Sequence, residues 1–176
     1  MATKTPKTRK AKVEKNAGKA VEPMPHVEAL QSLRILVRAA QRHSSWIEAQ
    51  CSVPGAQLWL MQELQDEPGL SVRAIAEKMA IHQTTVSNML DTLEKRGLIT
   101  RRRDSSDQRV VKLALTTDGA ALLGKAPTPA RGLLPEALSR MDAESLDNLN
   151  NGLRALIGII SMGEEMYGLQ PLPFTM

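Results

Sequence analysis

Two short apolar stripes in the middle of the chain limit its possible folds more than any other feature. The first occupies positions i, i+3, i+4 and i+7 from Val72, and the second repeats this spacing from Val86. Each spacing places its apolar side chains on one face of a helix. We expect one helix from Ser71 and the next from about His82, ended by Gly97 in the manner of a C′ glycine. The sequence thus predicts two amphipathic helices joined by a short turn.

Two β-prone runs follow these helices, at residues 98–103 and 110–116. In the second run, Val111, Leu113 and Leu115 alternate with Lys112 and Ala114, which is the period of a half-buried strand. A polar loop at 104–108 separates the runs. The order helix, turn, helix, strand, loop, strand predicts a winged helix-turn-helix, so the expected fold class is mainly α with a small β-hairpin wing.

Further helices are expected on both sides of this core, which spans about residues 53–116. Apolar spacing predicts a long helix at 26–50 and another that begins near Pro54, with Ser52 as its possible cap. Thr117 and Asp118 are expected to cap a helix that runs to about residue 125, and the prolines of 127–135 to interrupt the chain. The last helix, at 142–165, has a heptad-like apolar seam that suits pairing between subunits. Its residues are Leu146, Leu149, Leu153, Leu156 and Ile160.

Composition supports a helical domain with a local basic surface. Aromatic residues make up only 2% of the chain, and a β-sandwich core usually needs more of them. Residues 1–25 hold seven Lys or Arg against two Glu, a charge of +5, so the total of +4 leaves −1 for the remainder. We expect 1–25 to be disordered, either as a solubilising tail or as a nonspecific DNA arm. The domain is expected over 26–165, followed by a tail at 166–176.

The second helix of the pair has a polar face without charge in its first two turns. Its residues are Gln83, Thr84, Thr85, Ser87 and Asn88. Gln and Asn can pair with adenine, and Thr can contact a thymine methyl group or a phosphate. An ordinary solvated face would more often carry Glu/Lys pairs. This face therefore indicates a recognition helix, which enters the major groove by its N-terminal end.

Arginines flank the predicted hairpin loop. Arg101, Arg102 and Arg103 precede it, and Arg109 follows it, two residues after Asp107. An Arg at the tip of a projecting hairpin can enter the minor groove, and Asp107 can hold its guanidinium in place. Taken alone, the run is equally typical of a charged, solvated hairpin.

Several of these segments together resemble the MarR family. The resemblance rests on the runs SVRAIAEKMA from Ser71, TVS from Thr85, LEKRGLI from Leu93, RDSSDQR from Arg103 and LTTDG from Leu115. It implies a homodimer whose N- and C-terminal helices interlock while two winged lobes bind a pseudo-palindromic DNA site. The Pro-rich stretch 127–135 departs from the family pattern, because a linking helix is hard to place there.

The resemblance also implies which residues contact DNA. Asp107 and Arg109 match the family's D-x-R wing motif, in which the Arg reaches the minor groove. Residues 83–88 match the part of the recognition helix that meets the major groove. With the wing arginines, the expected DNA-binding residues are Gln83, Thr84, Thr85, Ser87, Asn88, Arg101, Arg103, Asp107 and Arg109.

Many members of this family respond to a small molecule, often an aromatic acid, bound between the dimerisation helices and the winged lobe. An Arg or His beside an indole can receive an aromatic carboxylate, so a candidate ligand site is Arg42, His43, Trp46 and Trp59. The alternative is that both tryptophans are packing residues and that Arg42 is solvated. Other members sense oxidants through cysteine, but Cys51 has no neighbouring cation in sequence to lower its pKa.

The sequence therefore predicts a cytoplasmic, sequence-specific DNA-binding regulator, most simply a ligand-released homodimeric repressor. An activator, a redox sensor acting through Cys51, and a winged-helix module that binds proteins instead of DNA are the alternatives. The chain has no G-x-S-x-G motif, no phosphate-binding loop and no metal-ligand spacing among its three histidines. We expect no enzymatic activity, no cofactor and no membrane partner.

Overall fold

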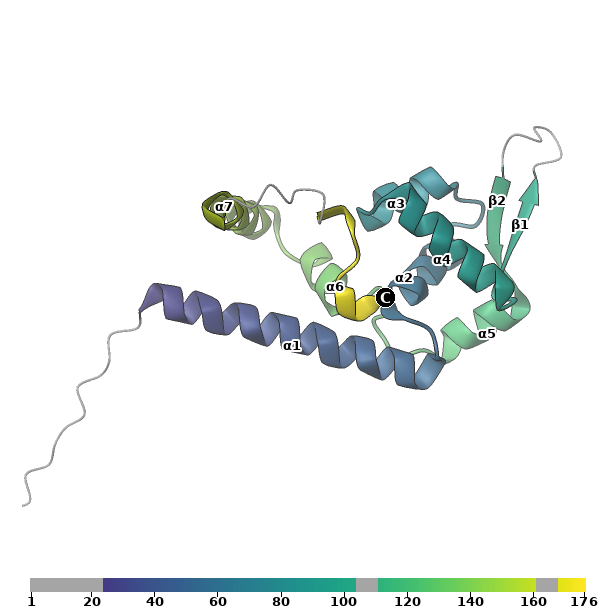
Figure 1. The fold of residues 1–176 in the computed structure, drawn as a ribbon, viewed down its shortest axis with the longest axis horizontal. Coiled ribbons are helices and arrows are strands. Elements are labelled where there is room, and N and C mark those ends of the chain that lie inside the picture. Colours follow the sequence, from purple (N-terminus) through teal and green to yellow (C-terminus); the bar gives the residue numbers. More distant parts are fainter. Residues whose placement is uncertain (1–23, 104–110, 161–167) are drawn as a thin grey trace, which may run out of the picture.

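The computed structural model describes residues 24–103, 111–160 and 168–176, which form helices and one antiparallel hairpin (Figure 1). The elements are α1 (Pro25–Cys51), α2 (Gly55–Asp66), α3 (Val72–Met79), α4 (Gln83–Lys95), β1 (Ile99–Arg103), β2 (Val111–Leu115), α5 (Thr117–Lys125), α6 (Leu133–Ser139), α7 (Ala143–Ile160) and η2 (Pro173–Thr175). The winged helix-turn-helix fold and its mainly α class are confirmed. The loop residues Asp107 and Arg109 lie outside the described residues, as does most of the predicted N-terminal tail at 1–25.

The core of the winged lobe is built from the two apolar stripes. Ile75, Ala76 and Met79 of α3 are buried, as are Val86, Met89, Leu90 and Leu93 of α4. They pack with buried residues of α2 and of the hairpin. Fully burying a Leu or Ile side chain contributes about 1.5–3 kcal/mol, so this shared core fixes the orientation of α4.

Capping residues set where the helices of the lobe begin and end. The Ser71 hydroxyl accepts a hydrogen bond from the Ala74 N–H at 3.1 Å, so Ser71 is the N-cap of α3. Ser52, expected to cap α2, instead ends α1 in a left-handed conformation, with its N–H bonded to the Glu48 carbonyl. That prediction was wrong because Pro54, with extended backbone, takes the N-cap position of α2.

The N-cap of α5 is Thr116, one residue before the predicted pair Thr117 and Asp118. Its hydroxyl accepts from the Gly119 N–H at 3.0 Å and donates to the Gly97 carbonyl at 2.7 Å. A Cβ on Gly119 would lie 2.0 Å from the Leu98 carbonyl oxygen. Only glycine fits there, which gives the final glycine of the LTTDG run a packing reason.

The hairpin pairs Ile99 with Leu115 and Arg101 with Leu113. Ile99 and Leu113 are buried against the lobe, whereas Val111 is 38% exposed. Of the three apolar residues predicted to alternate in this strand, only the central one, Leu113, is fully buried. The strand end at Val111 is exposed because the hairpin extends beyond the lobe (Figure 1).

The Pro-rich stretch 127–135 is not wholly irregular. Helix α6 begins at Leu133 and contains Pro135 at its third position. A proline is tolerated there because the first-turn N–H groups have no partner within the helix. Residues 168–176, expected to form a tail, lie against the domain, and the Ser44 hydroxyl donates to the Phe174 carbonyl at 2.7 Å.

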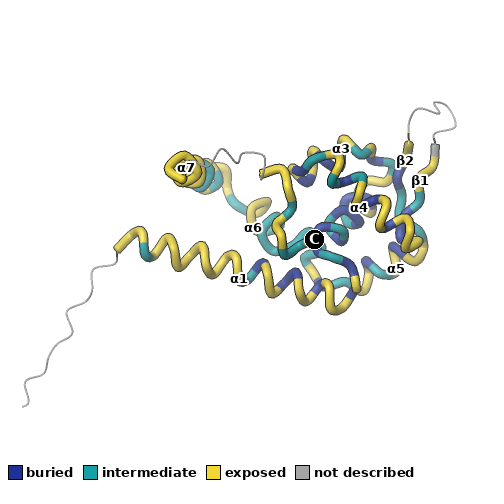
Figure 2. Tube along the Cα trace, viewed as in Figure 1, coloured by how far each residue is buried: buried dark blue, intermediate teal, exposed yellow. Residues whose placement is uncertain are grey.

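The two terminal helices are largely exposed (Figure 2). The described part of α7 buries no residue, and its seam residues Leu153, Leu156 and Ile160 are 38–56% exposed. The N-terminal half of α1 exposes Leu30, Leu33, Ile35, Leu36 and Val37. Both helices therefore present apolar surface that the single chain leaves uncovered.

Candidate functional site

The N-terminal half of α4 presents an uncharged polar surface. Gln83, Thr84 and Asn88 are exposed, and Thr85 and Ser87 are half-buried at the edge of the apolar stripe. The structure thus brings all five predicted residues to one helix, on the side away from the core. The Thr92 hydroxyl donates to the Asn88 carbonyl at 3.0 Å, which leaves the Asn88 amide outside that bond.

Arg101 in β1 is held against α4. Its guanidinium forms ion pairs with Asp91 and with Glu94, the latter at 3.4 Å between Nε and Oε2. The predicted role of Arg101 was a DNA contact, but in the structure its side chain points toward two carboxylates of α4. The pairing connects the wing to α4. The side chain of Arg103 lies outside the described residues, as do Asp107 and Arg109.

A cavity of about 430 Å³ lies between the winged lobe and α1. Its walls come from α1, α2, the end of α3, α6 and residues 168–176, and they are mostly apolar side chains and backbone. Ile47 and Ala56 form part of the buried wall. A cavity of this size is large enough for a small organic ligand.

Two of the four predicted ligand-site residues line this cavity. His43 and Trp59 do, and the His43 Nε2–H donates to the Pro129 carbonyl at 3.0 Å. Arg42 is exposed on α1, in a separate surface depression with Arg38 and Ser45. Successive residues of a helix are about 100° apart, so Arg42 and His43 face different sides.

Trp46 is also absent from the cavity wall. Its side chain is 51% exposed, and its ring meets the His43 ring edge-on, with 5.8 Å between centroids. The four predicted residues therefore do not form one site. The structure keeps His43 and Trp59 as cavity residues and places Arg42 and Trp46 outside.

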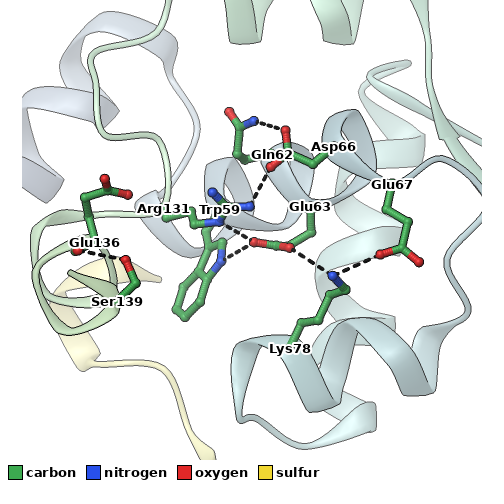
Figure 3. Close-up of polar contacts among 9 residues, drawn as sticks. All are labelled: Trp59, Gln62, Glu63, Asp66, Glu67, Lys78, Arg131, Glu136 and Ser139. Carbon is green, nitrogen blue, oxygen red and sulfur yellow. Dashed lines mark hydrogen bonds and ion pairs between the residues drawn. The ribbon is translucent and has the colours of Figure 1, made fainter. Parts of the chain in front are cut away.

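The cation of the cavity wall is Arg131, which the sequence reasoning missed (Figure 3). Its Nε donates to Glu63 Oε1 at 2.6 Å and its Nη2 to Asp66 at 2.5 Å. The hydrogen bond to Glu63 raises the pKa of Arg131. No local pattern could reveal this cluster, because 68 residues separate Arg131 from Glu63.

Glu63 is the buried centre of this cluster. It is 5% exposed, and its carboxylate also accepts from Trp59 Nε1 at 2.9 Å. Lys78 of α3 lies 3.9 Å from the second carboxylate oxygen and forms a shorter pair, 3.0 Å, with Glu67. The cluster joins α2, α3 and the segment before α6 at one edge of the cavity.

Cys51 is buried at the end of α1. Burial raises the pKa of its thiol, which disfavours the reactive thiolate. Among the described residues, no group of His, Cys, Asp and Glu is arranged to hold a metal ion. Within the same ranges, no helix is both long and apolar enough to cross a membrane.

Comparison with known proteins gives a consistent result. Residues 55–111 match the profile of the MarR family. The chain is 35% identical over 94 residues to the organic hydroperoxide resistance transcriptional regulator of Bacillus subtilis (strain 168). This match covers 53% of this chain and 63% of that protein. It is 31% identical over 94 residues to the HTH-type transcriptional repressor MdtR of the same strain, covering 53% and 61%. These matches span less than two thirds of either relative.

Among solved structures, a MepR-like protein crystallised with pseudoligands superposes with a TM-score of 0.53 and 23% identity. The superposition covers 78% of this chain and 97% of that one. At this identity the likeness shows a shared fold.

Proposed function

We propose that the chain is a transcription repressor of the MarR family, since residues 55–111 match that family's profile and the chain is similar to two curated regulators. In this proposal it binds a pseudo-palindromic DNA site as a homodimer and releases it when a small ligand binds. The observation that carries the proposal is the uncharged, exposed polar surface of α4, held in place by a buried apolar stripe. One of its relatives, MdtR, is named a transcriptional repressor.

The chemistry of α4 suits the major groove. Gln83 and Asn88 are exposed amides that can form bidentate hydrogen bonds with adenine, and Thr84 can contact a thymine methyl group. The backbone N–H groups at the start of the helix favour a phosphate. In this proposal Arg109 supplies the minor-groove contact, and Asp107, two residues before it in sequence, holds its guanidinium in place. Arg103, the last residue of β1, adds a further DNA contact.

The exposed apolar faces of α1 and α7 support the homodimer. Ile157 and Ile159 of α7 are 61% and 80% exposed, and Ile35 of α1 is 67% exposed. Soluble monomers rarely leave a large contiguous apolar surface open to water. Pairing through these helices would cover it and place two recognition helices ~34–36 Å apart, one helical turn of DNA.

The cavity beside α1 supports a small-ligand effector. Its mostly apolar wall, with Trp59 at one edge, suits a flat organic ligand. Arg131, which also pairs with Glu63 and Asp66, can donate to a polar group of that ligand. A ligand there contacts both α1 and the winged lobe, so it can change how the lobe sits on the dimerisation helices.

DNA binding is tested by an electrophoretic shift assay on an operator selected from random sequence. Asn88→Ala is expected to reduce the preference for operator over random DNA by ~1–3 kcal/mol, because a base contact is lost. Glu77→Ala, on the exposed face of α3, is the matched control. An equal loss on both DNAs would assign Asn88 to phosphate.

The wing contact has its own variant, Arg109→Ala, which should weaken operator binding and leave the fold and dimer intact. The salt dependence of binding separates a DNA-binding protein from a protein-interaction module, because log K falls with log salt by ~0.9 per phosphate contact. A flat salt dependence and an unchanged affinity of Arg109→Ala would refute the DNA-binding function.

The dimer is tested by sedimentation equilibrium. Leu156→Asp places a charge in the α7 seam and is expected to give a monomer, whereas Asn148→Asp, on the exposed side of the same helix, should not. Dimers of unchanged affinity in Leu156→Asp would exclude α7 from the interface.

The effector site is tested by thermal shift with a series of small aromatic acids. A bound acid raises Tm through its preference for the folded state. Leu134→Trp adds bulk to the cavity wall and should abolish the shift, whereas Ala137→Trp, exposed on the same helix and outside that wall, should retain it. Equal shifts in both variants would place the acid elsewhere.

A further inference from the structure

Residues 168–176, the yellow segment in Figure 1, form part of the wall of the cavity between α1 and the winged lobe. Six of the nine line it: Gly168, Gln170, Pro171, Leu172, Phe174 and Thr175. The space available to a ligand is therefore bounded by a piece of the same chain. The segment meets two separate parts of the domain.

The first attachment is to α1. Ser44 is buried, and its hydroxyl donates to the Phe174 carbonyl at 2.7 Å. Gly55, at the start of α2, faces the same point, since a Cβ added there would lie 3.1 Å from Ser44 Oγ and 3.9 Å from Thr175 Cβ. A small residue at position 55 thus leaves room for the segment beside α1.

The second attachment is to the turn of the helix-turn-helix. The His82 N–H donates to the Leu169 carbonyl at 2.9 Å. His82 is the N-cap residue of α4, and its own carbonyl accepts from the Val86 N–H at 3.1 Å. His82 therefore connects one end of the segment directly to the first turn of α4.

The segment is held more weakly than the core beneath it. Leu169, Leu172 and Met176 are 43%, 46% and 57% exposed, whereas Ile47 and Ala56 of the cavity wall are 1% and 3% exposed. Pro171 and Pro173 have no N–H to donate. Segments with few buried contacts open more readily than the core.

We propose that residues 168–176 form a removable strap that forms one wall of the effector cavity and holds the start of α4 in place through His82. A flat organic ligand larger than the space beside the strap displaces the strap, and loss of the strap frees the turn before α4. This inference rests on the proposed ligand response and names the element that transmits it. Such a ligand and the strap exclude each other because both need the space that the strap occupies.

The test compares the full chain with a chain ended after residue 167, by amide hydrogen exchange measured with NMR in the absence of DNA. Removing the strap should speed exchange at the His82 amide by about 10-fold or more, because that N–H loses its acceptor. The Val86 amide, bonded within α4, is the internal control. A synthetic peptide of residues 168–176, added to the shortened chain, should restore slow exchange at His82.

Two full-length variants keep the test decisive if the shortened chain does not fold. Ser44→Ala removes the donor to Phe174 and should speed exchange at His82, whereas Ser45→Ala, exposed on the same helix, should not. Phe174→Asp should expel the strap and increase binding of the dye ANS to the cavity. Unchanged His82 exchange and unchanged dye binding in Ser44→Ala and Phe174→Asp would overturn the proposal. Because neither measurement uses DNA, a failure of DNA binding is scored separately.

Discussion

Glu63 offers the sharpest test of what holds α2 to the edge of the cavity. Glu63→Ala removes a carboxylate that is 5% exposed and that accepts hydrogen bonds from Trp59 and Arg131. A hydrogen bond to a charged group contributes about 1.5–3 kcal/mol, which we assign to the Trp59 contact. The Arg131 side chain is 36% exposed, so solvent screening limits its pair to about 1 kcal/mol.

The expected loss in the free energy of unfolding is therefore about 2.5–4 kcal/mol. For a chain of this size, that corresponds to a fall in Tm of roughly 5–15 °C. Urea denaturation followed by tryptophan fluorescence and circular dichroism measures the loss. A matched control is Glu67→Ala, because Glu67 also pairs with Lys78 but its side chain is 60% exposed. That variant should change stability by less than about 0.5 kcal/mol.

A double-mutant cycle with Arg131→Met isolates the ion pair, which should show a coupling of about 1 kcal/mol. If Glu63→Ala and Glu67→Ala proved equally stable, the reasoning from burial would be refuted. A coupling near zero would instead assign the stabilisation to Trp59 alone.

Three further outcomes follow from the packing and the cysteine. Gly119→Ala should lower stability by about 1–3 kcal/mol in urea denaturation, because its Cβ would clash with the Leu98 carbonyl. Its control is Gly124→Ala, which should be neutral or stabilising because an added Cβ there has nothing within 4 Å. Equal effects of the two variants would refute the steric account. Thr116→Val removes the cap of α5 and should cost about 1 kcal/mol in the same assay, and no loss would show that the cap is dispensable. Burial raises the pKa of the Cys51 thiol, so its alkylation by iodoacetamide at pH 7–8 should be slower than that of a free cysteine and should accelerate as pH rises. Fast alkylation at neutral pH would revive the redox-sensor alternative.

The sequence was sufficient for the features that depend on local periodicity. The stripes from Val72 and Val86 predicted α3 and α4, and the alternation around Leu113 predicted the second strand. The predicted caps at Ser52 and Thr117 were wrong because neighbouring residues take these positions. Pro54 is the N-cap of α2, and Thr116 is the N-cap of α5. Such choices depend on one or two backbone angles, which residue spacing does not determine.

The features that the sequence did not reveal depend on contacts between distant segments. Arg131 meets Glu63 across 68 residues, and Ser44 meets Phe174 across 130. No periodic pattern marks either pair. Helix α6 was not predicted because it contains Pro135. A proline is tolerated in the first turn of a helix but breaks the helix further along, and the sequence does not show in which of these positions Pro135 lies.

The pairing of Arg101 with Asp91 and Glu94 has a consequence for engineering this lobe. A transplanted α4 that lacked the two acidic residues would leave the arginine unmatched and alter the angle of the hairpin. If α4 has the proposed DNA-reading role, exchanging it for that of a relative requires Arg101, Asp91 and Glu94 to be transferred together. Substitutions confined to residues 83–88 avoid this constraint, because they leave the joint between helix and hairpin untouched.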